Sequence, residues 1–317
     1  MMLYDGTDRV YVTGLKNSGR KTLISSIIHE FAFNAVWSDG NQWELSAMGK
    51  DAEMLEDAEL IEKKMTSLEK IKVFDLEKVA SDSNYKVPDF ADLGLWINNE
   101  ICGRIHFSNI TGKQDGGKIL TQYMFSVILV VIDCNMIVNN DSEYIDTIYE
   151  KMTKALNICQ DKPRVVFALT KADILTDEMK KNNFAEFYAL FEKNCGKLVS
   201  HCMKNAVIYR KRAVSALNES TSEIFGSDGN LLEEPNFKPW ETDNLLVDIV
   251  SLATPLTRMK LCDIIERCND VIRRRRSVFN SESIRAKIIL RTARKHLCTT
   301  VKNIYPLDNA MKYLEKI

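Results

Sequence analysis

The chain has no run of about 18 apolar residues, the length that a helix needs to cross a bilayer, so it predicts no transmembrane segment. Its first residues, Met1 to Asp5, lack the basic and then apolar layout of a secretory signal peptide. The eight cysteines are scattered and none forms a C-x-x-C pair, which favours reduced thiols over a disulfide framework or a zinc site. These absences predict a cytoplasmic protein.

Internal repeats and low-complexity segments are also absent, and the 317 residues, 45% of them hydrophobic, are enough for one large domain with a sizeable core. The formal charge of −1 hides a strong asymmetry: residues 255–317 carry a net charge of +9, which leaves −10 for residues 1–254. We therefore expect a main domain over 1–254, interrupted by an insert at about 37–90, and a basic helical extension over 255–317.

Within the insert, residues 42–46 alternate and predict an extra strand, residues 51–72 predict a surface helix, and residues 79–92 predict a loop with Pro88 as breaker. Residues 226–230 predict a turn, and Asp133 is expected to close a buried strand. Pro255 predicts the break into the C-terminal helices.

Four short motifs follow one another in this main domain, and each follows a predicted strand. They are the glycine loop G-L-K-N-S-G at 14–19, N-I-T-G at 109–112 after a hairpin, T-K-A-D at 170–173, and S-A-L at 215–217. The predicted strands lie near 9–13, 93–97, 103–109, 126–133, 164–169 and 206–215, and the predicted helices near 21–34, 141–159, 176–204 and 241–253. This alternation is typical of an α/β sheet that is mostly parallel.

In this order the motifs resemble those of P-loop GTPases of the Ras-like (TRAFAC) class, across roughly residues 8 to 254, although several motif positions are substituted. The insert also resembles that of prokaryotic double-GTPase and GTPase-associated proteins, and the glycine loop is similar to that of Rag-type GTPases. The resemblance implies a three-layer α/β domain with one antiparallel hairpin, and GTP or GDP as ligand.

The resemblance assigns a nucleotide-binding role to sixteen residues. They are Gly14, Lys16, Asn17, Ser18, Gly19, Arg20, Lys21, Thr22, Asn109, Gly112, Thr170, Lys171, Asp173, Ser215, Ala216 and Leu217. The Asp173 carboxylate would accept two hydrogen bonds from guanine, a contact that adenine cannot make. The backbone of 215–217 would contact the guanine O6.

The glycine loop departs from the pattern G-x-x-x-x-G-K-[ST]. Read without a gap, the chain has Arg20 in place of the lysine and Lys21 in place of the hydroxyl residue that binds Mg²⁺. A shift by one position would instead give Lys21 and Thr22 these roles, with Thr22 as a weak metal candidate. A plain strand-to-helix turn that needs glycine is the third interpretation.

The other magnesium and catalytic positions are also changed. Asn109 stands where the family has an aspartate, and Lys113 and Gln114 are weak candidates for orienting a water molecule. No threonine lies between Thr66 and Thr111, so serines 81 and 83 are the nearest hydroxyl residues ahead of the hairpin. A cation beside the metal position would repel Mg²⁺, which makes Mg²⁺ binding uncertain.

These substitutions favour a guanine-nucleotide-binding protein with impaired hydrolysis, a pseudo-GTPase or slow GTPase that acts as a switch or scaffold for a protein partner. One alternative is an active GTPase that uses Lys21 and Thr22, and another is an interaction domain that binds no nucleotide. Residues 255–317 are expected to form a solvated helical appendage that docks on the acidic main domain, and they are also the candidate partner surface. Nucleic acid or an anionic membrane surface is the weaker alternative, because no aromatic residues alternate with these charges.

Overall fold

The computed structural model describes residues 7–33, 36–38, 41–47, 72–82, 84–97, 100–112, 120, 125–159, 163–205, 208–274, 284, 286–288 and 290–291. Its centre is an eight-stranded sheet in the order β2-β3-β4-β5-β1-β6-β7-β8. The strands are β1 (Asp8–Gly14), β2 (Val36–Ser38), β3 (Asn41–Ala47), β4 (Phe90–Ile97), β5 (Glu100–Ser108), β6 (Val127–Asp133), β7 (Arg164–Thr170) and β8 (Tyr209–Ala213). Strands β5, β1, β6, β7 and β8 run parallel to one another.

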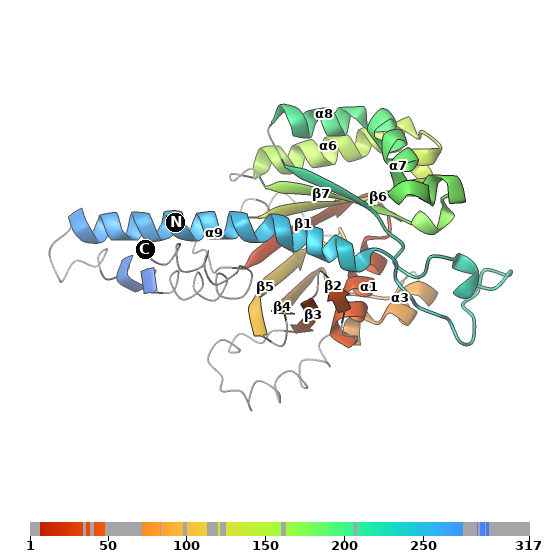
Figure 1. Ribbon diagram of the computed structural model, residues 1–317, viewed down its shortest axis with the longest axis horizontal. Helices are drawn as coiled ribbons and strands as arrows, with labels where there is room; N and C mark the ends of the chain where they lie inside the picture. Colours follow the sequence, from red (N-terminus) through yellow and green to blue (C-terminus); the bar gives the residue numbers. More distant parts are fainter. Residues whose placement is uncertain are drawn as a thin grey trace.

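Helices cover both faces of the sheet, which makes the three expected layers (Figure 1). The described helices are α1 (Arg20–Phe33), α3 (Leu76–Ser81), α5 (Cys134–Val138), α6 (Ser142–Ile158), α7 (Asp177–Asn194), α8 (Gly196–Lys204) and α9 (Thr242–Arg274), with short 3₁₀ turns at 72–74, 172–174 and 221–223. Helices α1 and α9 pack on one face, and α6, α7 and α8 pack on the other. The expected three-layer α/β architecture with a mostly parallel sheet is confirmed by this layering.

The alternation of β6 explains why this strand lies at the centre. Val127, Leu129 and Val131 pack with α1 and α9, whereas the residues between them pack with α6 to α8. All seven residues of β6 are buried. A strand that is apolar on both faces is stable only between two helical layers, as expected for a parallel strand.

The antiparallel part of the sheet is wider than the single hairpin that the sequence predicts. The expected hairpin is β4 and β5, and β3 and β2 continue the antiparallel pairing beyond it. The insert therefore contributes two strands, of which the sequence indicated β3 only. The helix expected at 51–72 lies almost entirely outside the described residues.

Two helical predictions need correction. The loop expected from residue 79 begins later, because α3 extends to Ser81 and is capped at its start by the Asp75 carboxylate, which accepts from the Lys78 amide. The single helix expected over 176–204 is interrupted twice, by non-helical backbone at 181–184 within α7 and by Cys195 between α7 and α8.

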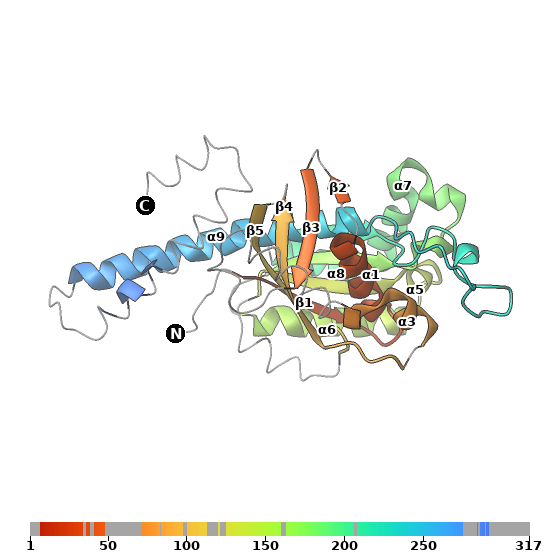
Figure 2. The same cartoon turned by 90° about the horizontal axis from the view of Figure 1, so that it is seen from below.

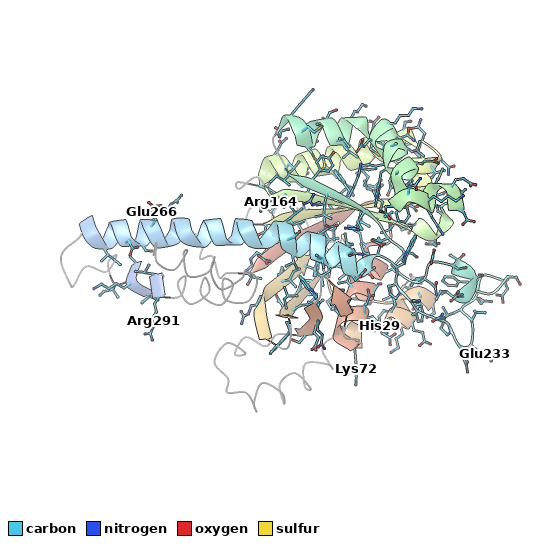
Figure 3. All side chains as sticks on the ribbon, viewed as in Figure 1. His29, Lys72, Arg164, Glu233, Glu266 and Arg291 are labelled. Atoms are coloured by element: carbon cyan, nitrogen blue, oxygen red, sulfur yellow. The ribbon has the colours of Figure 1, made fainter. Side chains whose placement is uncertain are left out.

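Helix α9 continues through Pro255, where the sequence predicted a break. It runs along the sheet and then extends beyond it, as Figures 1 and 2 both show. The Arg164 guanidinium, at the start of β7, donates to the Leu252 carbonyl at 2.5 Å and attaches the packed half of the helix (Figure 3). Glu266 lies on the projecting half (Figure 3). Among the described residues, no helix has an apolar stretch long enough to span a bilayer.

Glu30 of α1 joins α1 to the start of α9, where the Thr242 hydroxyl donates to its carboxylate. Burial raises the pKa of Glu30 from its usual 4.5 to about 7, against the effect of the Thr242 hydrogen bond; nearby Asp243 raises it further. The folded protein therefore holds this proton more tightly than the unfolded chain does. The stability that Glu30 contributes is complete below about pH 4.5 and is lost as the pH rises through 7.

We expect Glu30→Gln to raise the free energy of unfolding by about 1 to 3 kcal/mol at pH 8, with the gain shrinking towards pH 4.5. The amide oxygen still accepts from Thr242, and the ionisation that costs stability is gone. Urea unfolding at several pH values measures the difference, with the exposed Glu77→Gln as control. If the difference in the free energy of unfolding stayed constant from pH 5 to pH 8, the raised pKa of Glu30 would be disproved.

Candidate functional site

The four motifs meet at one edge of the sheet. Because β5, β1, β6 and β7 run parallel, their carboxyl ends lie along the same edge, and each expected motif follows one of these ends or that of β8. Ligands of open α/β sheets bind at this edge. The topology therefore brings together residues more than 200 positions apart in the chain, from Gly14 to Leu217.

The glycine loop between β1 and α1 is tightly packed. A Cβ atom on Gly14 would lie 2.6 Å from the Val131 carbonyl oxygen and 2.7 Å from Ser18 Oγ. Gly19 has φ = 84°, in the left-handed region that favours glycine. Ser18 is buried, and its Oγ has no hydrogen-bond partner among the described residues. An unpaired buried hydroxyl at the N-terminus of α1 is consistent with an anion that is held by this loop.

The loop is tied to the β7 motif by Thr170. Its hydroxyl lies 2.7 Å from the Ser18 carbonyl oxygen and 3.1 Å from the Ile132 carbonyl oxygen. On the other side of the loop, Lys151 Nζ of α6 lies 3.5 Å from the Gly14 carbonyl oxygen. Lys16 and Asn17 lie exposed on the outside of the loop. Lys151 is a cation that sequence reasoning missed, because nothing in α6 marks it apart from other surface lysines.

The two cations after Gly19 point to different places. The Arg20 guanidinium covers Gly112, where a Cβ atom would lie 2.2 Å from Arg20 Nη1, and it donates to the Thr111 carbonyl at 3.4 Å. Lys21 Nζ donates to the Tyr85 carbonyl at 3.3 Å. Arg20 thus lies next to the N-I-T-G motif. Lys21 instead contacts the insert.

A cleft of about 230 Å³ opens beside the loop. Eight of the sixteen predicted residues line it: Gly19, Thr22, Thr170, Lys171, Asp173, Ser215, Ala216 and Leu217. The glycine loop, T-K-A-D and S-A-L thus share one cleft. Four further lining residues were not predicted, and they are Asn218, Thr221, Ile224 and Phe225. They come from the loop after S-A-L, which folds back because Ser215 and Trp240 exchange backbone hydrogen bonds.

The side chains of T-K-A-D are fixed by neighbouring polar groups. The Ser215 hydroxyl donates to Asp173 Oδ1 at 3.0 Å. Burial raises the pKa of Asp173, and the Ser215 bond opposes this rise. Lys171 has φ = 60° and its Nζ lies 2.6 Å from Asp133 Oδ2 at the end of β6. Asp133 also caps α5 by accepting from the Asn135 amide, so it is structural, as the sequence indicated.

Asn109 is buried, and its side chain turns into the sheet. The amide Nδ2 donates to the Val12 carbonyl at 2.8 Å and contacts the Tyr11 hydroxyl at 3.1 Å, and its Oδ1 has no partner among the described residues. Asn109 has φ = 62°, a conformation that asparagine tolerates better than most residues. The side chain thus joins β1 to the end of β5. Lys113 and Gln114 lie outside the described residues.

The insert reaches the N-I-T-G motif through a residue that the sequence did not single out. Ser81 bonds its own helix and Ser83 lies outside the described residues. Asp89, just before β4, instead accepts from Thr111 N at 2.7 Å and from Thr111 Oγ1 at 2.6 Å. The only signal in the sequence was that Asp89 is an acidic residue between Pro88 and a strand, at the end of a loop.

No protein-family model matches the chain, and no curated protein matches it. Solved structures do resemble it at a distance. Sup35 complexed with GDP has a TM-score of 0.31 at 10% identity, over 66% of this chain and 37% of that one. An SsGBP variant has a TM-score of 0.38 at 15% identity, over 80% and 58% respectively. The chain thus spans less than two thirds of the length of either structure.

A third structure is an ADP-ribosylation-factor-like GTP-binding protein, the small COPII coat GTPase SAR1 from Encephalitozoon cuniculi, in complex with GDP. It has a TM-score of 0.34 at 12% identity, over 77% of this chain and 80% of that one. Scores of this size carry no argument about what the chain does. The site must be interpreted from its own residues.

Proposed function

We propose that the chain binds a guanine nucleotide in the cleft between the glycine loop and T-K-A-D, and hydrolyses it slowly or not at all. The observation that carries this proposal is the shared cleft, which is lined by Gly19 and Thr22 as well as by Asp173 and Ser215. The partly buried Asp173 carboxylate suits a base with two adjacent N–H donors. The unpaired Ser18 hydroxyl suits a phosphate.

Slow hydrolysis is supported by the positions of the substituted residues. Phosphoryl transfer depends on Mg²⁺ and on charges that are positioned around the transferred group. Asn109 has its Nδ2 engaged with β1, and Lys21 is engaged with the Tyr85 carbonyl. Thr22 lines the cleft, and this favours the alternative of an active GTPase that uses Lys21 and Thr22. That alternative requires Lys21 to leave Tyr85.

The partner surface remains part of the same proposal. The projecting half of α9 belongs to residues 255–317, which carry a net charge of +9 (Figure 1). Glu30 and Thr242 connect α1, which begins at the glycine loop, to the first turn of α9. A nucleotide-dependent shift of α1 would act on α9 through this contact. We propose a switch or scaffold for a protein partner on this basis.

Calorimetric titration with GDP and ADP, and a phosphate-release assay with GTP, test the proposal, each with and without Mg²⁺. The wild type is expected to bind GDP and not ADP. Lys21→Ala is expected to weaken GDP binding by less than about fivefold, because one partly solvated hydrogen bond is lost, and to leave the phosphate-release rate at the wild-type level. The exposed Lys154→Ala is the control. A clear wild-type rate that collapses only in Lys21→Ala would favour the active GTPase. If GDP does not bind, the remaining alternative is an interaction domain that binds no nucleotide.

A further inference from the structure

Asp89 places a fixed negative charge between the insert and the N-I-T-G motif. Its Oδ1 accepts both the Thr111 amide and the Thr111 hydroxyl, and its backbone carbonyl accepts the Ile110 amide at 3.1 Å. Three hydrogen bonds therefore hold the residue in place. Its Oδ2 is buried and accepts no hydrogen bond from any described residue. An ionised Asp89 therefore acts on neighbouring groups through its charge, because no donor among the described residues engages Oδ2.

Arg20 is the group on which this charge acts. Burial lowers the pKa of the Arg20 guanidinium, and Asp89 is the strongest of the groups that oppose this effect. Arg20 also contacts Thr111, the residue that fixes Asp89. The first cation after the glycine loop is therefore partly neutralised by the protein's own carboxylate, before any ligand arrives.

The position of Asp89 along the sheet edge determines which phosphate it meets. The base end of the cleft lies at β7 and β8, because Asp173 and Ser215 follow these strands. The glycine loop lies at β1, and the next strand in the order is β5, which leads to Thr111 and Gly112. A phosphate chain that starts at the base end and crosses the loop therefore approaches Asp89 only with its last phosphate.

We propose that Asp89 makes the cleft select a nucleoside diphosphate over the triphosphate, an inference that rests on the proposed function. A third phosphate brings its charge towards the fixed Asp89 carboxylate, whereas a diphosphate ends at the loop. Two like charges repel each other more strongly in partly buried surroundings than in water. Asp89 is thus a specificity-determining residue, and it holds the N-I-T-G motif without help from a third phosphate.

Binding of GDP and of a non-hydrolysable GTP analogue to the full chain, with and without Mg²⁺, tests this selection. The wild type is expected to prefer GDP. Asp89→Asn keeps an oxygen acceptor for Thr111 and removes the charge. We expect it to raise the affinity for the GTP analogue by at least about tenfold and to change the GDP affinity by less than about twofold. Asp146→Asn, which removes the same charge from the outer surface of α6, is the control.

A salt series separates charge from a loosened loop. Salt screens the repulsion between Asp89 and the third phosphate, so the ratio of GDP affinity to GTP-analogue affinity of the wild type should fall between roughly 0.05 M and 0.5 M salt. The same ratio for Asp89→Asn should not change. Equal changes in both affinities, or a wild-type preference for the triphosphate, would overturn the role of Asp89 while leaving the proposed function intact. Absence of binding by either nucleotide to both proteins would overturn the two together.

Discussion

Asp173→Asn is expected to weaken GDP binding by roughly 1.5 to 3 kcal/mol, a factor of about 10 to 150. The variant keeps an oxygen that accepts the Ser215 hydroxyl, so the loop that carries the residue stays in place. What it loses is the negative charge and one acceptor that face the base. The oxygen of an asparagine amide can accept a hydrogen bond from one of the two guanine N–H groups. The NH₂ group of the amide then faces the other guanine N–H group and cannot accept from it. Calorimetric titration of wild type and variant with GDP measures the loss.

The specificity of the effect needs two comparisons. Asp177→Asn removes the same charge four residues along, at an exposed position in the first turn of α7, and should leave GDP affinity within about twofold. Xanthosine diphosphate has an oxygen in place of the guanine 2-amino group, so it should bind the variant better than the wild type. An unchanged GDP affinity in Asp173→Asn would refute base recognition by this residue.

Gly14→Ala is expected to disrupt the glycine loop itself. The added Cβ would lie 2.6 Å from the Val131 carbonyl oxygen and 2.7 Å from Ser18 Oγ, so the backbone of the loop must move. Overpacking against backbone costs about 1 to 3 kcal/mol of stability. Movement of the loop also misplaces the amide groups that would hold phosphate, and we expect GDP affinity to fall by at least about tenfold. Urea unfolding and titration measure the two effects.

Gly196→Ala provides the matched control for this substitution. Gly196 begins α8, and a Cβ atom there would meet no atom within 4 Å. Alanine in a helix is more stable than glycine by about 0.5 to 1 kcal/mol, so this variant should be as stable as the wild type or more so, with unchanged GDP binding. A Gly14→Ala protein that behaves like Gly196→Ala would show that the loop is a plain strand-to-helix turn.

Several elements could be predicted because their signals are local. The β-branched run at 127–133 and the apolar positions of α1 from Leu23 to Phe31 are buried as the periodicity indicated. The turn at 226–230 forms as expected, with Gly226 N–H bonded to the Asn230 carbonyl. The division between α7 and α8 and the course of α9 through Pro255 were not predicted. Neither feature follows from local helix propensity, which tertiary context can override.

By itself, the sequence determined where β1 and β4 to β8 lie and that each motif follows a strand end, because hydrophobic period and glycine conformation act over a few residues. Only the tertiary structure decided which side chains meet. Arg20 contacts Thr111 and Lys21 contacts Tyr85, and the residues of each pair are more than 60 positions apart in the chain. Asp89 lies against the N-I-T-G motif. Such contacts follow from strand order and loop path, and a side chain's direction becomes known only when its neighbours are in place.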